Sequence, residues 1–210
     1  MKLTKYAHAC FTLEKDGQIL VVDPGVLSKD FVVTDTIVGI IVTHSHPDHF
    51  DPDTLAKIYD KNPDSILFST TEVVEKMVDH TPEVVVPGEK KVIGNFDLTF
   101  FGGEHAVIHK DVPIIDNVGV LINETVYYPG DSFVLPNIPV DTLAVPVGAP
   151  WLKTSESIDF MMAINPRLAF ATHNGLLSDD GKDFTDAWLK RFADPAGITY
   201  SRLDGQTIDI

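Results

Sequence analysis

The chain has 210 residues, and its 31 acidic side chains against 16 Lys and Arg give a formal net charge of −15. A hydrophobic content of 44% with 22% charged residues is typical of a globular protein and argues against a disordered chain. A protein that binds polyanions needs a basic face, and Lys and Arg form no cluster here. We therefore expect neither nucleic acid nor an anionic membrane as the main partner.

The single cysteine, Cys10, excludes a disulfide framework and a cysteine-rich zinc module. The sequence contains no run of about 18 apolar residues that would span a bilayer. Residues 1–6 also lack the apolar core of a signal peptide. We therefore expect a cytoplasmic protein, and the sequence does not indicate its oligomeric state.

Short β-type runs dominate the first part of the chain. Asp16-Gly17 is typical of a hairpin turn between two of them. The last of the four runs is continuously apolar and β-branched, which predicts a strand buried on both faces. The predicted strands are Leu3–Tyr6, Cys10–Leu13, Ile19–Val22 and Ile37–Thr43.

Two helices are expected next, separated by a strand at Ile66–Phe68. Asp51-Pro52 supplies an N-cap and a proline at the first helical position, which predicts a helix over Pro52–Tyr59. Ser69-Thr70-Thr71-Glu72 fits a capping box and predicts a helix that continues to about Val78.

Strands return in the second half and alternate with two more helices. The predicted strands are Val84–Val86, Lys91–Ile93, Asp97–Phe101, Val118–Ile122, Thr125–Tyr128, Leu143–Val147, Leu168–Ala171, Ile198–Arg202 and Thr207–Ile210, and the predicted helices are Ser157–Ile164 and Phe184–Phe192. Strands first, then strands mixed with helices, predict an α/β fold with helices covering sheets. Because no repeat or linker interrupts the pattern, we expect residues 1–210 to form one domain.

Three imidazoles and a carboxylate directly follow the buried strand Ile37–Thr43, in the segment His44-Ser45-His46-Pro47-Asp48-His49. Neutral imidazole and carboxylate suit Zn, Mn and Fe(II), and ligands at a strand end face a crevice. Residues two apart in a loop point in different directions. One such cluster can therefore serve two metals.

Three further residues of ligand type each follow an apolar strand. His105 comes after Asp97–Phe101, Asp131 after Thr125–Tyr128 and His173 after Leu168–Ala171. Small residues beside them allow close approach of the backbone. This pattern predicts a convergent metal site on the rim of the sheets.

The ordered set His-x-His-x-Asp-His, then His, Asp and His, resembles that of the metallo-β-lactamase superfamily, and the resemblance covers essentially the whole chain. It implies a four-layer αβ/βα sandwich. Three segments narrow it to the small metal-dependent hydrolases of the branch that includes the L-ascorbate-6-phosphate lactonases. They are Tyr6-Ala7-His8-Ala9-Cys10-Phe11, Val22-Asp23-Pro24-Gly25 and Val147-Gly148-Ala149-Pro150-Trp151.

The resemblance implies two divalent metal ions, zinc first, with manganese or iron as alternatives. Every ligand position is filled: His44, His46 and His105 for the first ion, Asp48, His49 and His173 for the second, and Asp131 as the bridge. It further implies a hydrolase with a small-molecule substrate. The hypothesis is that a hydroxide between the ions attacks an ester, lactone or phosphoester bond, with Asp48 orienting it.

Three other functions stay open. They are an iron-dependent redox enzyme similar to the sulfur dioxygenases, a phosphodiesterase or nuclease, and a non-catalytic metal-binding module. The acidic composition argues against the nuclease, and the complete ligand set argues against the non-catalytic module.

Several residues near the ligands have two interpretations. His8 either packs at a strand end or, as the resemblance implies, lies at the edge of the site, where it contacts substrate or supports a ligand and is a catalytic candidate beside Asp48. Asp23 is expected to orient a ligand histidine. Trp151 and Phe133 lie in loops that overhang the site and either contact substrate or cover the core. Three cations, Lys153, Arg167 and Arg202, are candidates for anchoring a phosphate or carboxylate.

Overall fold

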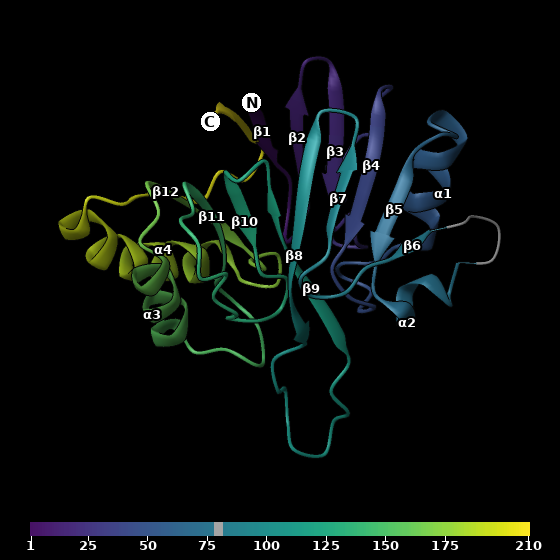
Figure 1. Ribbon diagram of the computed structural model, residues 1–210. Coiled ribbons are helices and arrows are strands. Elements are labelled where there is room, and N and C mark those ends of the chain that lie inside the picture. Colours follow the sequence, from purple (N-terminus) through teal and green to yellow (C-terminus); the bar gives the residue numbers. More distant parts are fainter. Residues whose placement is uncertain (78–81) are drawn as a thin grey trace.

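In the computed structural model, which describes residues 1–77 and 82–210, the first part of the chain builds most of one mixed sheet (Figure 1). In spatial order its strands are β14 (Gln206–Asp209), β1 (Lys2–Lys5), β2 (Phe11–Lys15), β3 (Gln18–Val22), β4 (Ile37–Val42), β5 (Ile66–Ser69) and β6 (Glu83–Val84). Pairing is antiparallel from β14 to β3 and parallel from β3 to β6.

The second sheet is also mixed. In spatial order its strands are β13 (Thr199–Ser201), β12 (Leu168–Thr172), β11 (Thr142–Pro146), β10 (Val126–Tyr128), β9 (Asp116–Ile122), β8 (Phe96–Glu104) and β7 (Lys90–Ile93). Pairing is parallel from β13 to β10 and antiparallel from β10 to β7.

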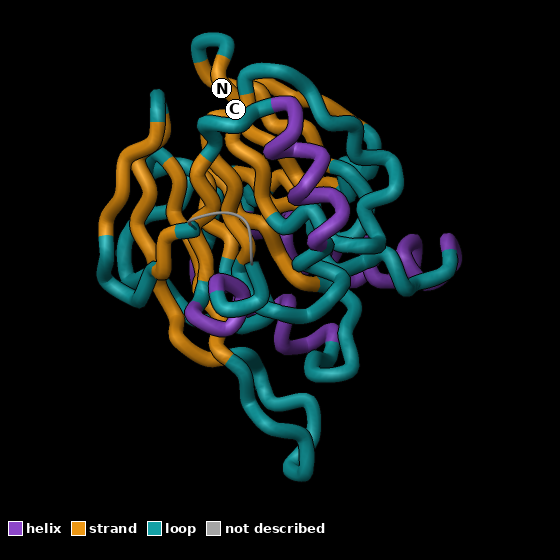
Figure 2. Tube along the Cα trace, turned by 90° about the vertical axis from the view of Figure 1, so that its right-hand side faces the viewer, coloured by secondary structure: helices purple, strands orange, loops and turns teal. Residues whose placement is uncertain are grey.

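Helices cover the outer faces of both sheets (Figure 1, Figure 2). The first sheet is covered by α1 (Pro52–Lys61) and α2 (Thr71–Val74), and the second by α3 (Thr154–Ile164) and α4 (Asp179–Ala193), which continues into a 3₁₀ turn at Asp194–Ala196. The predicted αβ/βα sandwich is thus confirmed. Within residues 1–77 and 82–210, no helix combines the length and the apolar character needed to cross a membrane.

The main core lies between the two sheets and follows the two-residue period of the strands. On β9, Val118, Val120 and Ile122 point into this core, whereas Leu121 packs with the residues under α3 and α4. The rings of Phe68 on β5 and Phe100 on β8 lie 6.3 Å apart between centroids. Large apolar side chains therefore tie the two sheets together.

Of the two helix starts predicted from capping residues, one is confirmed in its capping bond and the other is not. Asp51 caps α1 as predicted, because its carboxylate accepts a hydrogen bond of 3.2 Å from the Asp53 amide. The capping box predicted at Ser69–Glu72 is wrong. Thr70 makes no side-chain capping bond, and the Glu72 carboxylate instead accepts from Ser45 Oγ at 2.9 Å. The predicted helix end at Val78 lies outside the described residues.

Both later helices begin earlier than the apolar pattern predicts. The α4 helix starts at Asp179 instead of Phe184, because the Ser178 hydroxyl caps it by accepting from the Gly181 amide at 3.1 Å. Its first turn is polar, so the spacing of apolar residues gives no sign of it. Strands β8 and β9 are longer than predicted for the same reason, since their polar ends pair as far as Glu104 and Asp116. The loop between them, residues 107–114, projects from the body of the protein (Figure 1, Figure 2).

Truncation of Phe100 tests the core between the sheets. Phe100 is fully buried, so Phe100→Ala should lower the free energy of unfolding by about 3–5 kcal/mol. Phe184 on α4 is 65% exposed, and Phe184→Ala should change it by about 0.5 kcal/mol or less. Urea denaturation of the metal-free protein measures both. Equal losses in the two variants would contradict this packing.

Candidate metal centre

The four chain segments that carry the predicted ligands meet at one edge of the sandwich. They follow β4, β8, β10 and β12, and they bring all seven predicted ligands together with His8. The ligand atoms form two groups, and within each group they lie within 4.8 Å of one another. The first group is His44, His46, His105 and Asp131, and the second is His8, Asp48, His49 and His173.

Asp131 lies between the two groups. Its Oδ2 atom is 3.3 Å from Nε2 of His105 in the first group and 3.0 Å from Nε2 of His173 in the second. Its Oδ1 atom is 3.3 Å from Nε2 of His49. The Asn117 side chain holds the backbone there, because its Oδ1 accepts from the Asp131 amide at 3.0 Å. This position suits a carboxylate shared by two cations.

One buried carboxylate, Asp23, orients a histidine in each group. It accepts directly from Nδ1 of His49 at 2.7 Å. It also accepts from the Thr43 hydroxyl at 2.7 Å, and that oxygen in turn lies 3.0 Å from Nδ1 of His44. Because the Thr43 proton goes to Asp23, the His44 Nδ1 must be the donor to Thr43. The expectation that Asp23 orients a ligand histidine thus agrees with the geometry, and Thr43 is a participant that the sequence did not reveal.

Two other predicted ligand histidines, His105 and His173, are oriented by backbone carbonyls. Nδ1 of His105 donates to the Ala106 carbonyl at 2.6 Å, and Nδ1 of His173 donates to the Gly148 carbonyl at 2.8 Å. With Nδ1 carrying the proton, each neutral ring presents a bare Nε2. Nε2 of His44, His49 and His105 is buried and has no hydrogen-bond partner among the described residues, as does Oδ1 of Asp131. These orphaned atoms fit a divalent cation, because buried polar atoms are otherwise paired.

His8 lies in the second group, but its hydrogen bonds give it a different role. The Gly175 amide donates to its Nδ1 at 3.1 Å, so that nitrogen must be unprotonated. In the neutral ring the proton is then on Nε2, which lies 3.0 Å from Asp48 Oδ2 and donates to it. Burial lowers the His8 pKa to about 4, which keeps the ring neutral. His8 therefore has no lone pair left for a metal and acts as a donor to Asp48.

The carboxylates of Asp48 and Asp131 shift the protonation of the side chains around them. Burial by itself would raise the Asp48 pKa, but hydrogen bonds from His173 and His8 outweigh it and hold that pKa far below the usual range. Burial by itself would lower the His173 pKa. The negative charge and hydrogen bonds of Asp131 and Asp48 outweigh this effect and raise the His173 pKa to about 10. In the metal-free protein a proton on His173 thus compensates the buried carboxylates. Metal binding would release this proton.

Two features of the first sheet support the ligand loop. A Cβ atom on Gly25 would lie 2.0 Å from the Asp48 carbonyl oxygen, so only glycine fits there. The fully buried Lys5 donates from Nζ to the carbonyls of Tyr6 and His8, the latter at 2.8 Å. These bonds hold the turn in which His8 has a φ of 58°. Sequence analysis missed Lys5, because a lysine in a strand pattern indicates an exposed position.

Of the other residues near the predicted ligands, one contacts the site directly. Trp151 contacts the site, since its Nε1 donates to Asp131 Oδ2 at 2.9 Å, and Phe133 packs against Trp151 with ring centroids 5.2 Å apart. Glu104 is exposed in the β8–β9 ribbon and takes no part. Cys10 is buried, and burial raises the pKa of its thiol.

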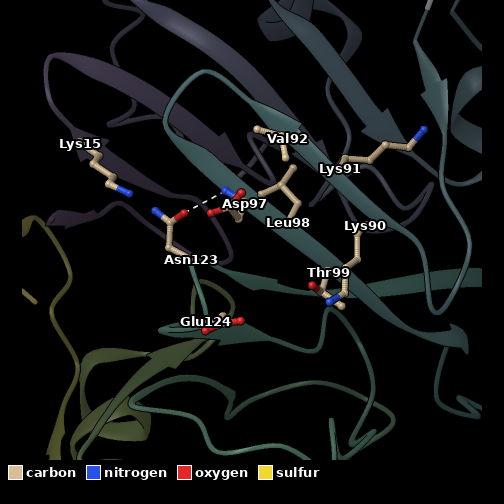
Figure 3. Close-up of a pocket in the computed structure, with 9 residues that line it drawn as sticks. All are labelled: Lys15, Lys90, Lys91, Val92, Asp97, Leu98, Thr99, Asn123 and Glu124. Carbon is tan, nitrogen blue, oxygen red and sulfur yellow. Dashed lines mark hydrogen bonds between the residues drawn. The ribbon is translucent and has the colours of Figure 1, made fainter.

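A pocket of about 360 Å³ lies at the opposite end of the strands (Figure 3). It is lined by Lys15, Lys90, Lys91, Val92, Asp97, Leu98, Thr99, Asn123 and Glu124. Within it the Asn123 side chain accepts from the Asp97 amide at 2.8 Å. At about 3.3 Å per residue, strand β8 places Asp97 roughly 25 Å from His105. The pocket is therefore separate from the metal centre.

Comparison with known proteins agrees with this geometry. A family model described as a β-lactamase superfamily domain matches residues 2–173. Protein Rv0786c of Mycobacterium tuberculosis is 31% identical over 212 residues, which cover 99% of this chain and 93% of that protein.

Two solved structures share the fold. Igni18, a novel metallo hydrolase from Ignicoccus hospitalis, has a TM-score of 0.74 at 16% identity, covering 100% of this chain and 98% of that one. The metallo-β-lactamase fold protein YhfI from Bacillus subtilis has a TM-score of 0.74 at 18% identity, covering 99% of each chain. With the family match spanning all seven predicted ligands, the chain belongs to the metallo-β-lactamase superfamily of metal-dependent hydrolases.

Proposed function

We propose that this protein is a dinuclear metal-dependent hydrolase that cleaves an ester, lactone or phosphoester bond of a small molecule, with zinc as the first choice of metal. His44, His46 and His105 would hold one ion, Asp48, His49 and His173 the other, and Asp131 would bridge them. His8 is left out of the ligand set, because its Nε2 proton points at Asp48 and its Nδ1 lone pair accepts from the Gly175 amide.

One observation carries the proposal. His44, His49 and His105 are fixed as Nδ1 donors by Thr43, Asp23 and the Ala106 carbonyl, so their bare Nε2 atoms lie close to Asp131. Burying such atoms without partners costs about 1–3 kcal/mol each, a cost that a bound cation would remove. A fold that only needed these histidines for packing would not orient them in this way.

The chemistry then follows from the residues around the two groups. Divalent ions bound there would polarise the scissile bond and lower the pKa of a water molecule to about 7. Asp48 stays ionised, so its carboxylate can orient that water, whose proton would pass to the solvent. His8, neutral and fixed by Gly175, keeps the Asp48 carboxylate in place by donating to Oδ2. The leaving group would take its proton from a water molecule at the site.

Within this proposal, neutral esters and lactones are better supported than phosphoesters. Two of the three candidate anion anchors are committed elsewhere. Arg167 donates to both oxygens of Asp141, at 2.9 and 2.8 Å. Arg202 donates to Asp183 and Asp186. Lys153 is exposed and follows Trp151 by two positions, so it is the candidate that stays available.

Substitution of the ligands tests the proposal. The wild-type protein loaded with zinc, manganese or ferrous iron should hydrolyse members of a panel of esters, lactones and phosphodiesters, and chelation should abolish this turnover. His46→Ala and Asp48→Ala should each remove it, since one takes a ligand from the first group and the other from the second. Metal content by elemental analysis should fall from two ions to one or none.

Asp141→Asn serves as the matched control, because it changes a carboxylate far from the ligand loops and should leave turnover intact. Undiminished turnover in both His46→Ala and Asp48→Ala would rule out the metal assignment. Activity that appears only with ferrous iron and dioxygen would instead identify a redox enzyme.

Asp23→Asn tests the orientation of the histidines. Asp23 accepts from the Thr43 amide, the Thr43 hydroxyl and His49 Nδ1, so the NH₂ of Asn must either face a donor or reverse the Thr43 hydroxyl that accepts from His44. Loss of such an orienting partner typically weakens metal binding by about 10–100-fold. Competition with a chromophoric chelator measures the affinity, with Asp141→Asn as control. An unchanged affinity for both ions would show that Asp23 does not set the histidine tautomers.

A further inference from the structure

Trp151 lies outside the proposed ligand set but contacts residues of both groups. It lies half-buried in the loop between β11 and α3. Its indole Nε1 donates to Asp131 Oδ2 at 2.9 Å. Its ring meets His105 of the first group edge-on, with centroids 5.9 Å apart, and His173 of the second group with centroids 6.3 Å apart.

The Asp131 carboxylate has little else to fix its orientation. Oδ1 has no hydrogen-bond partner among the described residues. Oδ2 faces ligand histidines, whose Nε2 atoms would be occupied once ions bind. Asn117 holds the backbone of Asp131, not its side chain. Within the described part of the chain, the Trp151 indole is thus the one donor to this carboxylate that would remain after metal loading.

The indole is itself held in place from the core. Phe133 packs on Trp151 with a centroid distance of 5.2 Å, and Phe160 of α3 packs on Phe133 at the same distance. Phe160 belongs to the buried cluster between α3 and the second sheet. A row of aromatic rings therefore connects the packed helix layer to the Asp131 carboxylate.

We propose that Trp151 is a positioning residue that sets the orientation of the Asp131 carboxylate between the two metal groups through its indole N–H. Oδ2 faces His105 of the first group and His173 of the second, and Oδ1 faces His49 of the second. A donor fixed on Oδ2 selects the rotation of the side chain that keeps both oxygens in these positions. This role rests on the proposed dinuclear centre and adds a residue to it.

The chain contains two tryptophans, so Trp188→Phe leaves Trp151 as the only indole. Trp188 is 37% exposed on α4, and its replacement should leave metal binding unchanged. Zinc added to the metal-free Trp188→Phe protein should then change the Trp151 emission in step with binding. In the reciprocal Trp151→Phe protein, the Trp188 emission should not respond.

Metal affinity, measured by chelator competition, decides the role of the N–H. Relative to Trp188→Phe, the double variant Trp151→Phe/Trp188→Phe should bind zinc about 10-fold more weakly. Incorporation of 3-benzothienylalanine at position 151 keeps the shape of the ring but removes the donor, and it should cause the same loss. Thermal unfolding of the metal-free proteins checks that each variant is folded.

The outcomes separate this role from simple packing and from the proposed function. Normal affinity with benzothienylalanine would overturn the proposal, whether or not Trp151→Phe weakens binding, because the N–H would then not be needed. The expected loss of affinity in a protein that hydrolyses no substrate would sustain the role of Trp151 and contradict only the hydrolase. Failure of the Trp188→Phe protein to bind any divalent ion would contradict both.

Discussion

The hydrogen bonds that Asp23 accepts are the constraint on which the rest of the metal centre depends. One oxygen takes the Thr43 amide and the other takes the Thr43 hydroxyl and His49 Nδ1. Through Thr43 the same carboxylate also fixes His44. A single buried charge at the end of β3 thus determines the tautomer of one histidine in each group. Its burial is tolerated because every contact it makes is with a donor.

The two sheets contribute unequally to this arrangement. The first sheet supplies the dense cluster after β4, together with Asp23 after β3 and His8 after β1. The second supplies single residues after β8, β10 and β12. Because the inner core joins the sheets through large side chains such as Phe68 and Phe100, these contributions meet in a fixed geometry. The geometry of the metal centre therefore depends on the packing between the two sheets.

Much of this was predictable from the sequence, and the exceptions have a common cause. The His44–His49 cluster, His105, Asp131 and His173 each follow an apolar strand, so the pattern of strand and ligand locates them. Thr43 and the Trp151 N–H act on Asp23 and Asp131, each 20 positions away, and Lys5 binds the nearby His8 carbonyl but also pairs with the distant Asp204. No local pattern encodes such contacts. Glu72 shows the converse error. Its local spacing predicts a capping box, but tertiary contacts with Ser45 and the Asp116 amide take its carboxylate.

The order of the ligands along the chain has a consequence for biosynthesis. All members of the first group, and the Asp23 and Thr43 side chains that orient it, precede residue 132. The second group needs His173, and its donor His8 is fixed by Gly175, near the carboxyl-terminal end. A nascent chain leaving the ribosome therefore presents a full ligand set for one ion while the other set still lacks a member.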